Sequence, residues 1–476
     1  MLASAGLTLL LQTQTAAERL AEARNGLDIP IGERLIGFVG IATMILIAYL
    51  MSYDRKRINW RLVASGFGLQ AVFGIVVLKT EFGRAVFQRV GDMITNLLGF
   101  QEQGARFVFG NLVQSTVPVT GDGATPGMVA QTGAYFAFNV LPTIIFFSAL
   151  MSVMYYLGIM QLIVKGLVSV MQRTFGTSGA ETLSASGNIF LGQTEAPLLI
   201  KPFVGKMTKS ELNTVMIGGF ATVAGGVLAA YVGMLSGYFP GIAAHLLAAS
   251  VMNAPAGLAL SKIILPETEV PETAAGVKAA DTVVDRPPNV GGWRARLLTS
   301  DSADNSVIEA AANGAGQGVM LAINVAAMLM AFVALVALLN SMLGWSGALV
   351  GFDGLSLQSI LGFLLRPLAW VMGVPWADTP YVGSLIGLKA TLNEFVAYAQ
   401  FATDLGGTQV LQPRSAIILT YALLGFANFS SIAIQIGGIG GLAPERKKDI
   451  AALGLRAMVA GNLAAFTSAS LAGMLS

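Results

Sequence analysis

The sequence predicts an all-α protein that crosses a membrane several times. Of its 476 residues, 54% are hydrophobic and 11% are charged, whereas a soluble domain usually has about 25% charged residues. Uncharged apolar segments long enough to cross a bilayer, which takes about 20 helical residues, recur along the whole chain. With no cysteine and one histidine, the chain offers no disulfide or thiolate site. A net charge of +2 gives no basic field for nucleic acid.

Basic residues orient about eight expected transmembrane helices. The first expected span is followed by the basic loop DRKRINWR (54–61), which the positive-inside rule places in the cytoplasm, with the N-terminus outside. That N-terminus lacks the basic start of a cleavable signal, and residues 12–26 are expected to form a short surface helix. Two regions, 81–115 and 364–376, are expected to be interfacial amphipathic helices. The expected spans are 35–53, 62–78, 135–164, 213–238, 241–265, 316–343, 415–440 and 450–475.

Two further apolar segments are too interrupted to cross. Residues 177–204, which include GNIFLGQTEAPLLIKPF (187–203), lie between basic residues that both indicate the cytoplasm, so we expect a re-entrant hairpin that enters and leaves by the inner face. Residues 378–404, which include SLIGLKATLNEFVAYAQF (384–401), are expected to form a second hairpin that enters from outside. Each hairpin precedes an interrupted span and then a cleaner span. This order predicts an inverted repeat, which in secondary transporters places the site near the membrane midplane.

The expected domain organisation follows from these repeats. It comprises an N-terminal extracytoplasmic segment (1–34), N-terminal spans and interfacial helices that are partly scaffold (35–175), a first repeat (176–265), a flexible cytoplasmic linker rich in Pro and Thr (266–305), a scaffold span with an outer interfacial helix (306–376), and a second repeat (377–476).

Four polar islands interrupt the repeats, at 187–197, 220–229, 388–398 and 425–435. A charged side chain at bilayer depth costs about 2.5–3.5 kcal/mol, so Glu195 and Glu394 should face a polar cavity or a partner. Carboxylates accept hydrogen bonds from sugar hydroxyls, and amides such as Gln193 and Asn428 both donate and accept. Phe426 offers a ring for stacking. The islands therefore indicate a neutral solute rich in hydroxyl groups.

An ion gradient is the expected energy source, since nothing in the sequence resembles a nucleotide-binding loop. Asn188, Thr222 and carbonyl groups freed by broken helices provide hard oxygen ligands that suit Na⁺.

Structural interpretations compete with each of these functional ones. Gly-rich stretches such as AGG (224–226) allow close helix packing, and Ser and Thr hydroxyls bond to the preceding helical turn. Either glutamate alone could belong to a buried ion pair with Lys201 or Lys389, and Asn428 could join two helices. His245 is better explained as a hydrogen-bonded interior group than as a proton relay. The functional interpretation gains weight because the four islands occupy equivalent places in the two halves.

The chain resembles the concentrative nucleoside transporter family in its shorter bacterial form. The resemblance rests on GLKATLNEFVAY (387–398), which matches the family signature, and on GNIFLGQTEAPLLIKPF and GFANFSSIAIQIGG (425–438). These motifs cover the region from 177 to 475. The resemblance implies a homotrimer of eight-span protomers with two re-entrant hairpins, importing nucleosides such as uridine and adenosine with Na⁺ or H⁺ through the bacterial inner membrane.

The family's site residues are carried over by motif. Gln193 and Thr194 would face the base, and Glu195 would approach it directly or through water. Glu394 would bind the ribose with Asn428 and Ser431. The remaining implied nucleoside neighbours are Gly192, Val227, Leu321 and Phe426. The implied Na⁺ ligands are the side chains of Asn188 and Thr222 and the carbonyls of Leu191 and Val223.

Two positions depart from the family pattern. Thr222 replaces a familiar Ser and keeps the hydroxyl, and Leu191 replaces a familiar Val, which does not matter if its carbonyl binds the ion. Asn188 favours Na⁺ over H⁺, because some proton-coupled bacterial relatives lack an asparagine-based sodium site.

We therefore expect a Na⁺-coupled nucleoside symporter, not an enzyme, that works by alternating access in the inner membrane with both termini on the periplasmic side. An H⁺-coupled nucleoside symporter is the first alternative. A membrane-embedded nucleoside hydrolase, which could also use two carboxylates, and a passive channel are less favoured. The sequence does not decide between purine and pyrimidine substrates.

Overall fold

The computed structural model describes residues 30–114, 116–118, 129–131, 136–274, 306–406 and 411–476. The regular structure of these residues is helical, apart from a short antiparallel ribbon of β1 (Thr116–Pro118) and β2 (Val129–Gln131). The predicted all-α class is confirmed. The predicted surface helix at 12–26 and most of the predicted linker lie outside the described residues.

The N-terminal helices follow the predicted hydropathy closely. Asn59 caps the second helix by accepting a hydrogen bond from the Leu62 amide, and Thr80 caps the third through the Gly83 amide. The third helix is the amphipathic one, with four buried residues among its 29. The helices are α3 (Ile31–Leu50), α4 (Trp60–Lys79) and α5 (Glu81–Phe109), with 3₁₀ turns at Arg55–Arg57 and Gly110–Val113.

The predicted span 135–164 was wrong at its inner end. Helix α6 (Phe136–Tyr156) stops eight residues earlier, and α7 (Ile159–Phe175) starts after Gly158, whose φ is 77°. Helix α7 buries only one side and carries Lys165 and Arg173. Apolar side chains therefore surround α6 on all sides but lie on only one side of α7. The hydropathy of 135–164, taken as one segment, does not show this change.

Each predicted hairpin is a pair of short helical arms joined by a turn. The arms of the first are 9 residues and 5 plus 4 residues long, and those of the second are 13 and 12. At 1.5 Å per residue, none reaches the roughly 30 Å of a hydrocarbon core. The arms are α8 (Gly179–Gly187), the 3₁₀ helix Ala196–Ile200 with α9 (Lys201–Val204), α16 (Thr379–Thr391) and α17 (Glu394–Leu405).

After each hairpin come a broken helix and an unbroken one. In the first repeat these are α10 (Lys209–Ala221) with α11 (Gly225–Leu235), then α12 (Ile242–Ile264). In the second they are α18 (Pro413–Leu423) with α19 (Phe429–Leu442), then, after a 3₁₀ turn at Pro444–Arg446, α20 (Lys447–Leu475). The repeated order predicted from hydropathy is therefore present in the helices.

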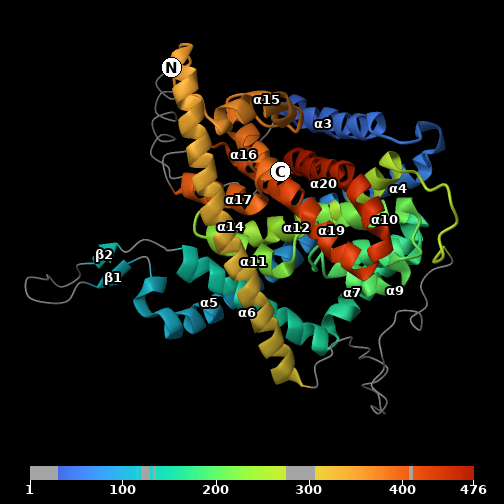
Figure 1. The fold of residues 1–476 in the computed structure, drawn as a ribbon, viewed down its shortest axis with the longest axis horizontal. Coiled ribbons are helices and arrows are strands. Elements are labelled where there is room, and N and C mark those ends of the chain that lie inside the picture. Colours follow the sequence, from blue (N-terminus) through green and yellow to red (C-terminus); the bar gives the residue numbers. More distant parts are fainter. Residues whose placement is uncertain (1–29, 115, 119–128, 132–135, 275–305, 407–410) are drawn as a thin grey trace, which may run out of the picture.

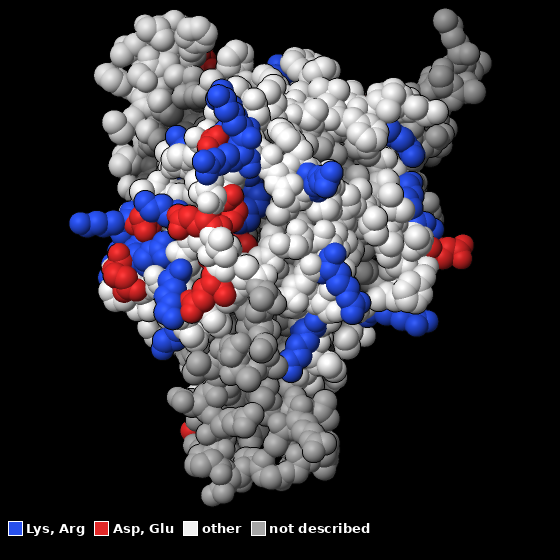
Figure 2. All heavy atoms as spheres, turned by 90° about the vertical axis from the view of Figure 1, so that its right-hand side faces the viewer, with Lys and Arg blue, Asp and Glu red and all other residues white. Residues whose placement is uncertain are grey.

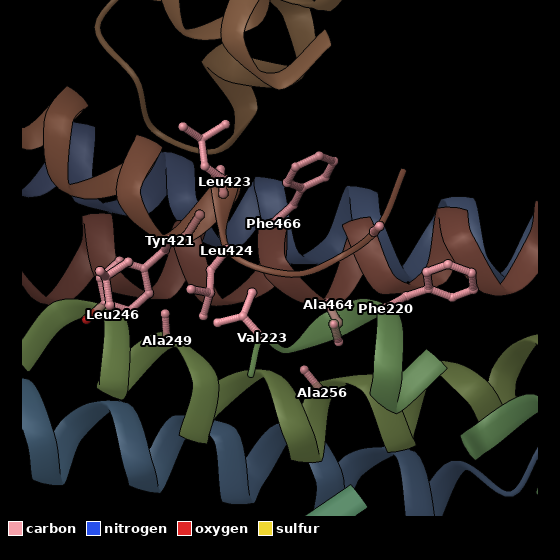
Figure 3. Packing of buried hydrophobic residues seen from close by; sticks show 14 of the residues in the cluster. Phe220, Val223, Leu246, Ala249, Ala256, Tyr421, Leu423, Leu424, Ala464 and Phe466 are labelled. Atoms are coloured by element: carbon pink, nitrogen blue, oxygen red, sulfur yellow. The ribbon is translucent and has the colours of Figure 1, made fainter. Parts of the chain in front are cut away.

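Helices α12 and α20 form the centre of the core and pack against each other. Residues of both breaks lie between them, and Figure 3 shows Val223 and Leu424 facing each other, with Leu246 and Ala249 beside them. Helices α4 and α3 cover this centre from outside, packed on α12 and α20 respectively. The core therefore places the two interrupted segments at the middle of the molecule.

A separate layer is formed by α14 (Val307–Leu349), packed along α6, and by α15 (Leu357–Val371), packed on α16. Helix α14 crosses the whole molecule in Figure 1. It has 43 residues, of which six are buried, and it extends past both ends of the predicted span 316–343. A helix this apolar with so little burial needs a covering of lipid or protein.

Seven helical segments in the described part of the chain are long and apolar enough to cross a membrane. The broken pair α10–α11 is one of them. The predicted seventh span, 415–440, is divided into α18 and α19, each shorter than 18 residues. In Figure 2 acidic and basic side chains gather together on the left of the face shown, and separate, mostly basic side chains stand on the otherwise uncharged described surface to the right.

Candidate functional site

The two broken helices meet at their breaks. The Phe426 amide donates to the Thr222 carbonyl at 3.3 Å, which joins the break at 222–224 to the break at 424–428. Gly425, in the second break, has φ 107°, and a Cβ there would lie 2.6 Å from the Phe220 carbonyl oxygen. Only glycine accepts this backbone conformation and this approach without strain.

Side chains from neighbouring helices pair with carbonyls that the breaks release. Asn253 Nδ2 donates to the Ala221 carbonyl at 2.7 Å, and Asn462 Nδ2 donates to the Ala427 carbonyl at 2.8 Å. The fully buried Lys389 donates to the carbonyls of Ala422 and Leu424, at 2.9 and 3.0 Å. These bonds satisfy polar backbone groups that would otherwise be buried without partners.

Four helix N-termini converge on one cavity of about 150 Å³. The cap residue of each of them lines it: Ala224 before α11, Asn393 before α17, Asn428 before α19, and Glu195 before the 3₁₀ helix. N-terminal helix ends carry partial positive charge, which stabilises carboxylates nearby. The full lining is Gly192, Gln193, Thr194, Glu195, Ala224, Val227, Leu321, Val325, Met328, Asn393, Glu394, Phe395, Phe426, Asn428, Ser430, Ser431 and Ile434.

All ten residues that the sequence assigned to the nucleoside are among these. The cavity also receives residues to which the sequence assigned no nucleoside contact. They are the cap residues Ala224 and Asn393, together with residues of α14, α17 and α19. Tyr231 and Gln435 lie just behind the lining and were missed as well. Gln435 belongs to the island at 425–435, and Tyr231 lies one helical turn after Val227, so their spacing offered a signal for both.

Glu394 is 4% exposed and is oriented from two sides. Asn428 Nδ2 donates to Oε2 at 2.8 Å, and the Tyr231 hydroxyl donates to Oε1 at 3.3 Å. Tyr231 is itself fully buried and stacks on Tyr398, with 4.3 Å between ring centroids. Because both donors leave lone pairs on the carboxylate unused, Glu394 can still accept hydrogen bonds from a ligand.

Gln193 is oriented by a second network. Its Nε2 donates to the Ser431 hydroxyl at 3.1 Å, and its Oε1 accepts from Gln435 Nε2 at 3.1 Å. Gln435 also donates to the Met216 carbonyl at 3.1 Å. These bonds connect the first hairpin to the last broken helix and decide which way the Gln193 amide points.

Within the described residues, neither Glu195 nor Glu394 is in an ion pair with a Lys or Arg nitrogen. Lys389 is occupied by backbone carbonyls instead. Lys201 is exposed. The alternative that these carboxylates serve as buried structural ion pairs therefore has no support in the geometry. An ion pair of that kind does exist elsewhere, where Lys262 binds Glu181.

Buried polar groups beside the first break include oxygen acceptors of the kind that bind a cation. Asn188 is completely buried, and neither its Oδ1 nor its Nδ2 has a hydrogen-bond partner. Thr222 donates to the Gly218 carbonyl at 2.9 Å, which leaves its oxygen lone pairs free. In the described part of the chain the carbonyls of Leu191 and Val223 accept no hydrogen bond.

Two contacts bring these groups together. The Gly225 amide donates to the Phe190 carbonyl at 2.9 Å, joining the hairpin turn to the break, and a Cβ at Gly218 would lie 3.1 Å from Asn188 Nδ2. Neutral oxygen ligands of this type suit Na⁺. The residues present therefore fit the ion that the sequence predicted.

Three family models match successive parts of the chain. They are the N-terminus of Na⁺-dependent nucleoside transporters over residues 39–112, a nucleoside recognition gate over 137–238, and the C-terminus of Na⁺-dependent nucleoside transporters over 245–473. An uncharacterized transporter of Haemophilus influenzae is 42% identical over 450 residues, which cover 92% of this chain and 97% of that protein. The chain belongs to the concentrative nucleoside transporter family.

Other members of the concentrative nucleoside transporter family agree with this assignment. The transporter YutK of Bacillus subtilis is 44% identical, with 92% of this chain and 99% of YutK covered. Sodium/nucleoside cotransporter 1 of Mus musculus is 42% identical over 93% of this chain, but the match spans 64% of the length of the mouse protein.

Solved structures extend the likeness to the fold. The transporter CNTnw in an inward-facing substrate-bound state has a TM-score of 0.80 and 43% identity, covering 93% of this chain and 97% of CNTnw. A CNTnw variant in an outward-facing state has a TM-score of 0.82 and 42% identity, covering 94% and 98%. The prediction of sodium-coupled nucleoside symport, and of a transporter that is not an enzyme, is confirmed at the level of the family.

Proposed function

We propose that this protein imports nucleosides together with Na⁺ by alternating access, with the cavity among the four helix N-termini as the nucleoside site. The observation that supports this most directly is the convergence of Glu394, Asn428 and Ser431 with Gln193, Thr194 and Glu195 on one cavity. The first group offers acceptors and donors to ribose hydroxyls, and the second offers amide, hydroxyl and carboxylate groups to a base edge. Phe426, Val227 and Leu321 supply apolar walls.

We further propose that Na⁺ binds between Asn188, Thr222 and the carbonyls of Leu191 and Val223. Ion and nucleoside would share one structural unit, because the hairpin turn at 188–195 contributes to both sites. Binding of Na⁺ would hold that turn against the break at 222–224 and so position Gln193 and Glu195 for the nucleoside. This arrangement explains why the ion should raise nucleoside affinity without touching the substrate.

Uptake of labelled uridine and adenosine into proteoliposomes tests this function. An inward Na⁺ gradient should drive accumulation of intact nucleoside, and a proton gradient of equal size should not. Uptake driven by protons alone would replace the proposal with the H⁺-coupled alternative. Downhill flux that ignores both gradients would indicate a passive channel.

The membrane arrangement is part of the proposal. We place eight spans, two re-entrant hairpins and both termini on the periplasmic side of a bacterial inner membrane, with the linker at 266–305 in the cytoplasm. The chain has no cysteine, so single introduced cysteines can be labelled with a membrane-impermeant maleimide in whole cells. Lys56→Cys should stay unlabelled and Asp353→Cys should be labelled; the reverse pattern would invert the orientation.

We also propose that the protein is a homotrimer. Helix α14 leaves an extended apolar side uncovered, on which large residues such as Met330, Leu338 and Trp345 are more than half exposed. Light scattering of the detergent-purified protein, corrected for bound detergent, should give three times the chain mass of 49.5 kDa. A monomer mass would remove this part of the proposal.

A further inference from the structure

Asn393 lies directly before Glu394 in the signature motif, and none of the binding roles above includes it. It lines the cavity and is 4% exposed. Its Oδ1 accepts a hydrogen bond from the Val396 amide at 2.8 Å and so caps α17. Because a backbone N–H can only donate, this cap decides which end of the side-chain amide is the oxygen. The Nδ2 end is buried and has no hydrogen-bond partner.

The other cap asparagine of the cavity shows the contrast. Asn428 caps α19 in the same way, with its Oδ1 accepting from the Ser431 amide at 2.9 Å, but its Nδ2 donates to Glu394 at 2.8 Å. Two equivalent caps therefore direct their amide ends differently: one completes the orientation of the carboxylate, and one is left without an acceptor. A buried donor without an acceptor destabilises the protein unless a ligand or water supplies one.

The chemistry of the missing acceptor follows from what stands beside Asn393. Glu394 accepts hydrogen bonds and therefore pairs with the hydrogen of a hydroxyl group, whereas Asn393 Nδ2 donates and pairs with an oxygen lone pair. A hydroxyl group has both. We propose that Asn393 Nδ2 donates a hydrogen bond to a hydroxyl oxygen of the nucleoside's sugar, so that adjacent residues of one helix N-terminus satisfy the two halves of the sugar's hydrogen bonding. This inference rests on the proposed function.

Asn393 is then a specificity-determining residue for the sugar. A site built around a buried donor rejects an analogue that lacks the matching acceptor, because the donor is left unpaired in the complex. The protein should therefore prefer ribonucleosides over whichever deoxynucleoside lacks the hydroxyl that Asn393 contacts. Base preference should be unaffected, since Gln193 and Thr194 lie on the first hairpin.

The test is a thermodynamic cycle between protein and ligand. Uridine, 2′-deoxyuridine and 3′-deoxyuridine are titrated into the purified full-length protein in saturating Na⁺, as wild type and as Asn393→Ser, which keeps a cap acceptor but removes the amide donor. We expect Asn393→Ser to weaken uridine binding about tenfold, the size of one hydrogen bond. For the deoxy analogue that lacks the hydroxyl contacted by Asn393, the dissociation constants of wild type and variant should agree within about twofold. Asn59→Ser, a cap substitution on α4 outside the cavity, should leave the dissociation constants of all three nucleosides unchanged.

Two results would overturn the inference. One is an unchanged uridine affinity in Asn393→Ser, and the other is an equal loss for uridine and both deoxy analogues, which indicates a disturbed helix rather than a lost sugar contact. If the serine variant does not fold, Asn393→Asp, which has the same shape and cap acceptor without the NH₂ group, takes its place in the same cycle. If the wild-type protein binds no nucleoside, the proposed function itself is wrong. If the wild type binds nucleoside but the substitution weakens uridine and both deoxy analogues equally, only this inference is wrong.

Discussion

At the scale of single residues, the site consists of side chains that are oriented by other side chains. Glu394 is oriented by Tyr231 and Asn428, and Gln193 by Ser431 and Gln435. Each bond joins residues more than 30 positions apart in the chain. Ligand recognition therefore depends on groups that do not all touch the ligand, and a substitution at either kind of position should alter binding.

Substitution of Glu394 by Gln should weaken nucleoside binding without unfolding the protein. Glutamine keeps the shape but replaces one carboxylate oxygen by a donor, so it offers ribose fewer acceptor positions, and the one that remains is neutral. Hydrogen bonds to charged groups contribute about 1.5–3 kcal/mol, which corresponds to a loss of roughly 10- to 150-fold in affinity. Isothermal titration with uridine measures the loss, and wild-type affinity in Glu394→Gln would remove this residue from the site.

Removal of the Asn188 amide should weaken Na⁺ binding without lowering the stability of the fold. Asn188→Ala should raise the Na⁺ concentration needed for half-maximal nucleoside binding by at least about tenfold, since it deletes an ion ligand. Its melting temperature in Na⁺-free buffer should not fall, because a buried amide without partners already costs about 1–3 kcal/mol. Asn253→Ala is the contrast: it loses the bond to the Ala221 carbonyl and should melt earlier. Unchanged Na⁺ dependence in Asn188→Ala would contradict the ion site.

At the scale of elements, the repeated unit is a short hairpin, a broken helix and an unbroken helix. The breaks expose backbone groups in the interior, and asparagine or lysine side chains of neighbouring elements pair with them. A broken helix is stable only with such partners. The elements therefore explain why polar residues recur in helices that are otherwise apolar.

The crossing of the two breaks depends on Gly425. Gly425→Ala places a side chain at φ 107° and 2.6 Å from the Phe220 carbonyl oxygen, so the breaks must move apart. Backbone strain of this kind costs about 1–3 kcal/mol, and thermal unfolding should show the loss together with abolished uptake. Gly437→Ala on α19, where a Cβ meets no atom within 4 Å, is the matched control. Equal behaviour of the two variants would show that the crossing is not required.

At the scale of the whole molecule, both proposed ligand sites share the turn at 188–195, and this sharing predicts thermodynamic linkage. Na⁺ should raise nucleoside affinity, and nucleoside should raise Na⁺ affinity by the same factor, typically about 5- to 150-fold. The two dissociation constants of each ligand, with and without the other, are measured by titration of the purified protein. Equal nucleoside dissociation constants with and without Na⁺ would rule out coupling through equilibrium binding.

The energy available for import follows from the membrane potential. One cation that moves inward through about 100 mV releases about 2.3 kcal/mol, which supports roughly 50-fold accumulation of an uncharged solute. A single Na⁺ site, as proposed at Asn188, is therefore sufficient for scavenging.

Most of the fold class and of the candidate lining was predictable from the sequence. Hydropathy is a local property, so apolar segments, interrupted segments and the basic loop at 54–61 could be located without knowing what packs on what. The ends of α6 and α14 could not be located in this way, because where a helix ends depends on the segments that pack against it as well as on its own residues. The ten residues that the family resemblance assigned to the nucleoside all line the cavity, and their roles in nucleoside binding stay predictions.

The sequence by itself determined that the chain is a helical membrane protein with polar islands in two similar halves, because composition, charge and motifs reside in neighbouring residues. Only the tertiary structure decided which islands meet. The bond from Phe426 to Thr222, the orientation of Gln193 and the unpaired amides of Asn188 and Asn393 all arise when the two halves dock. Hydrogen bonding depends on distance and direction in space, and no pattern of neighbouring residues contains either.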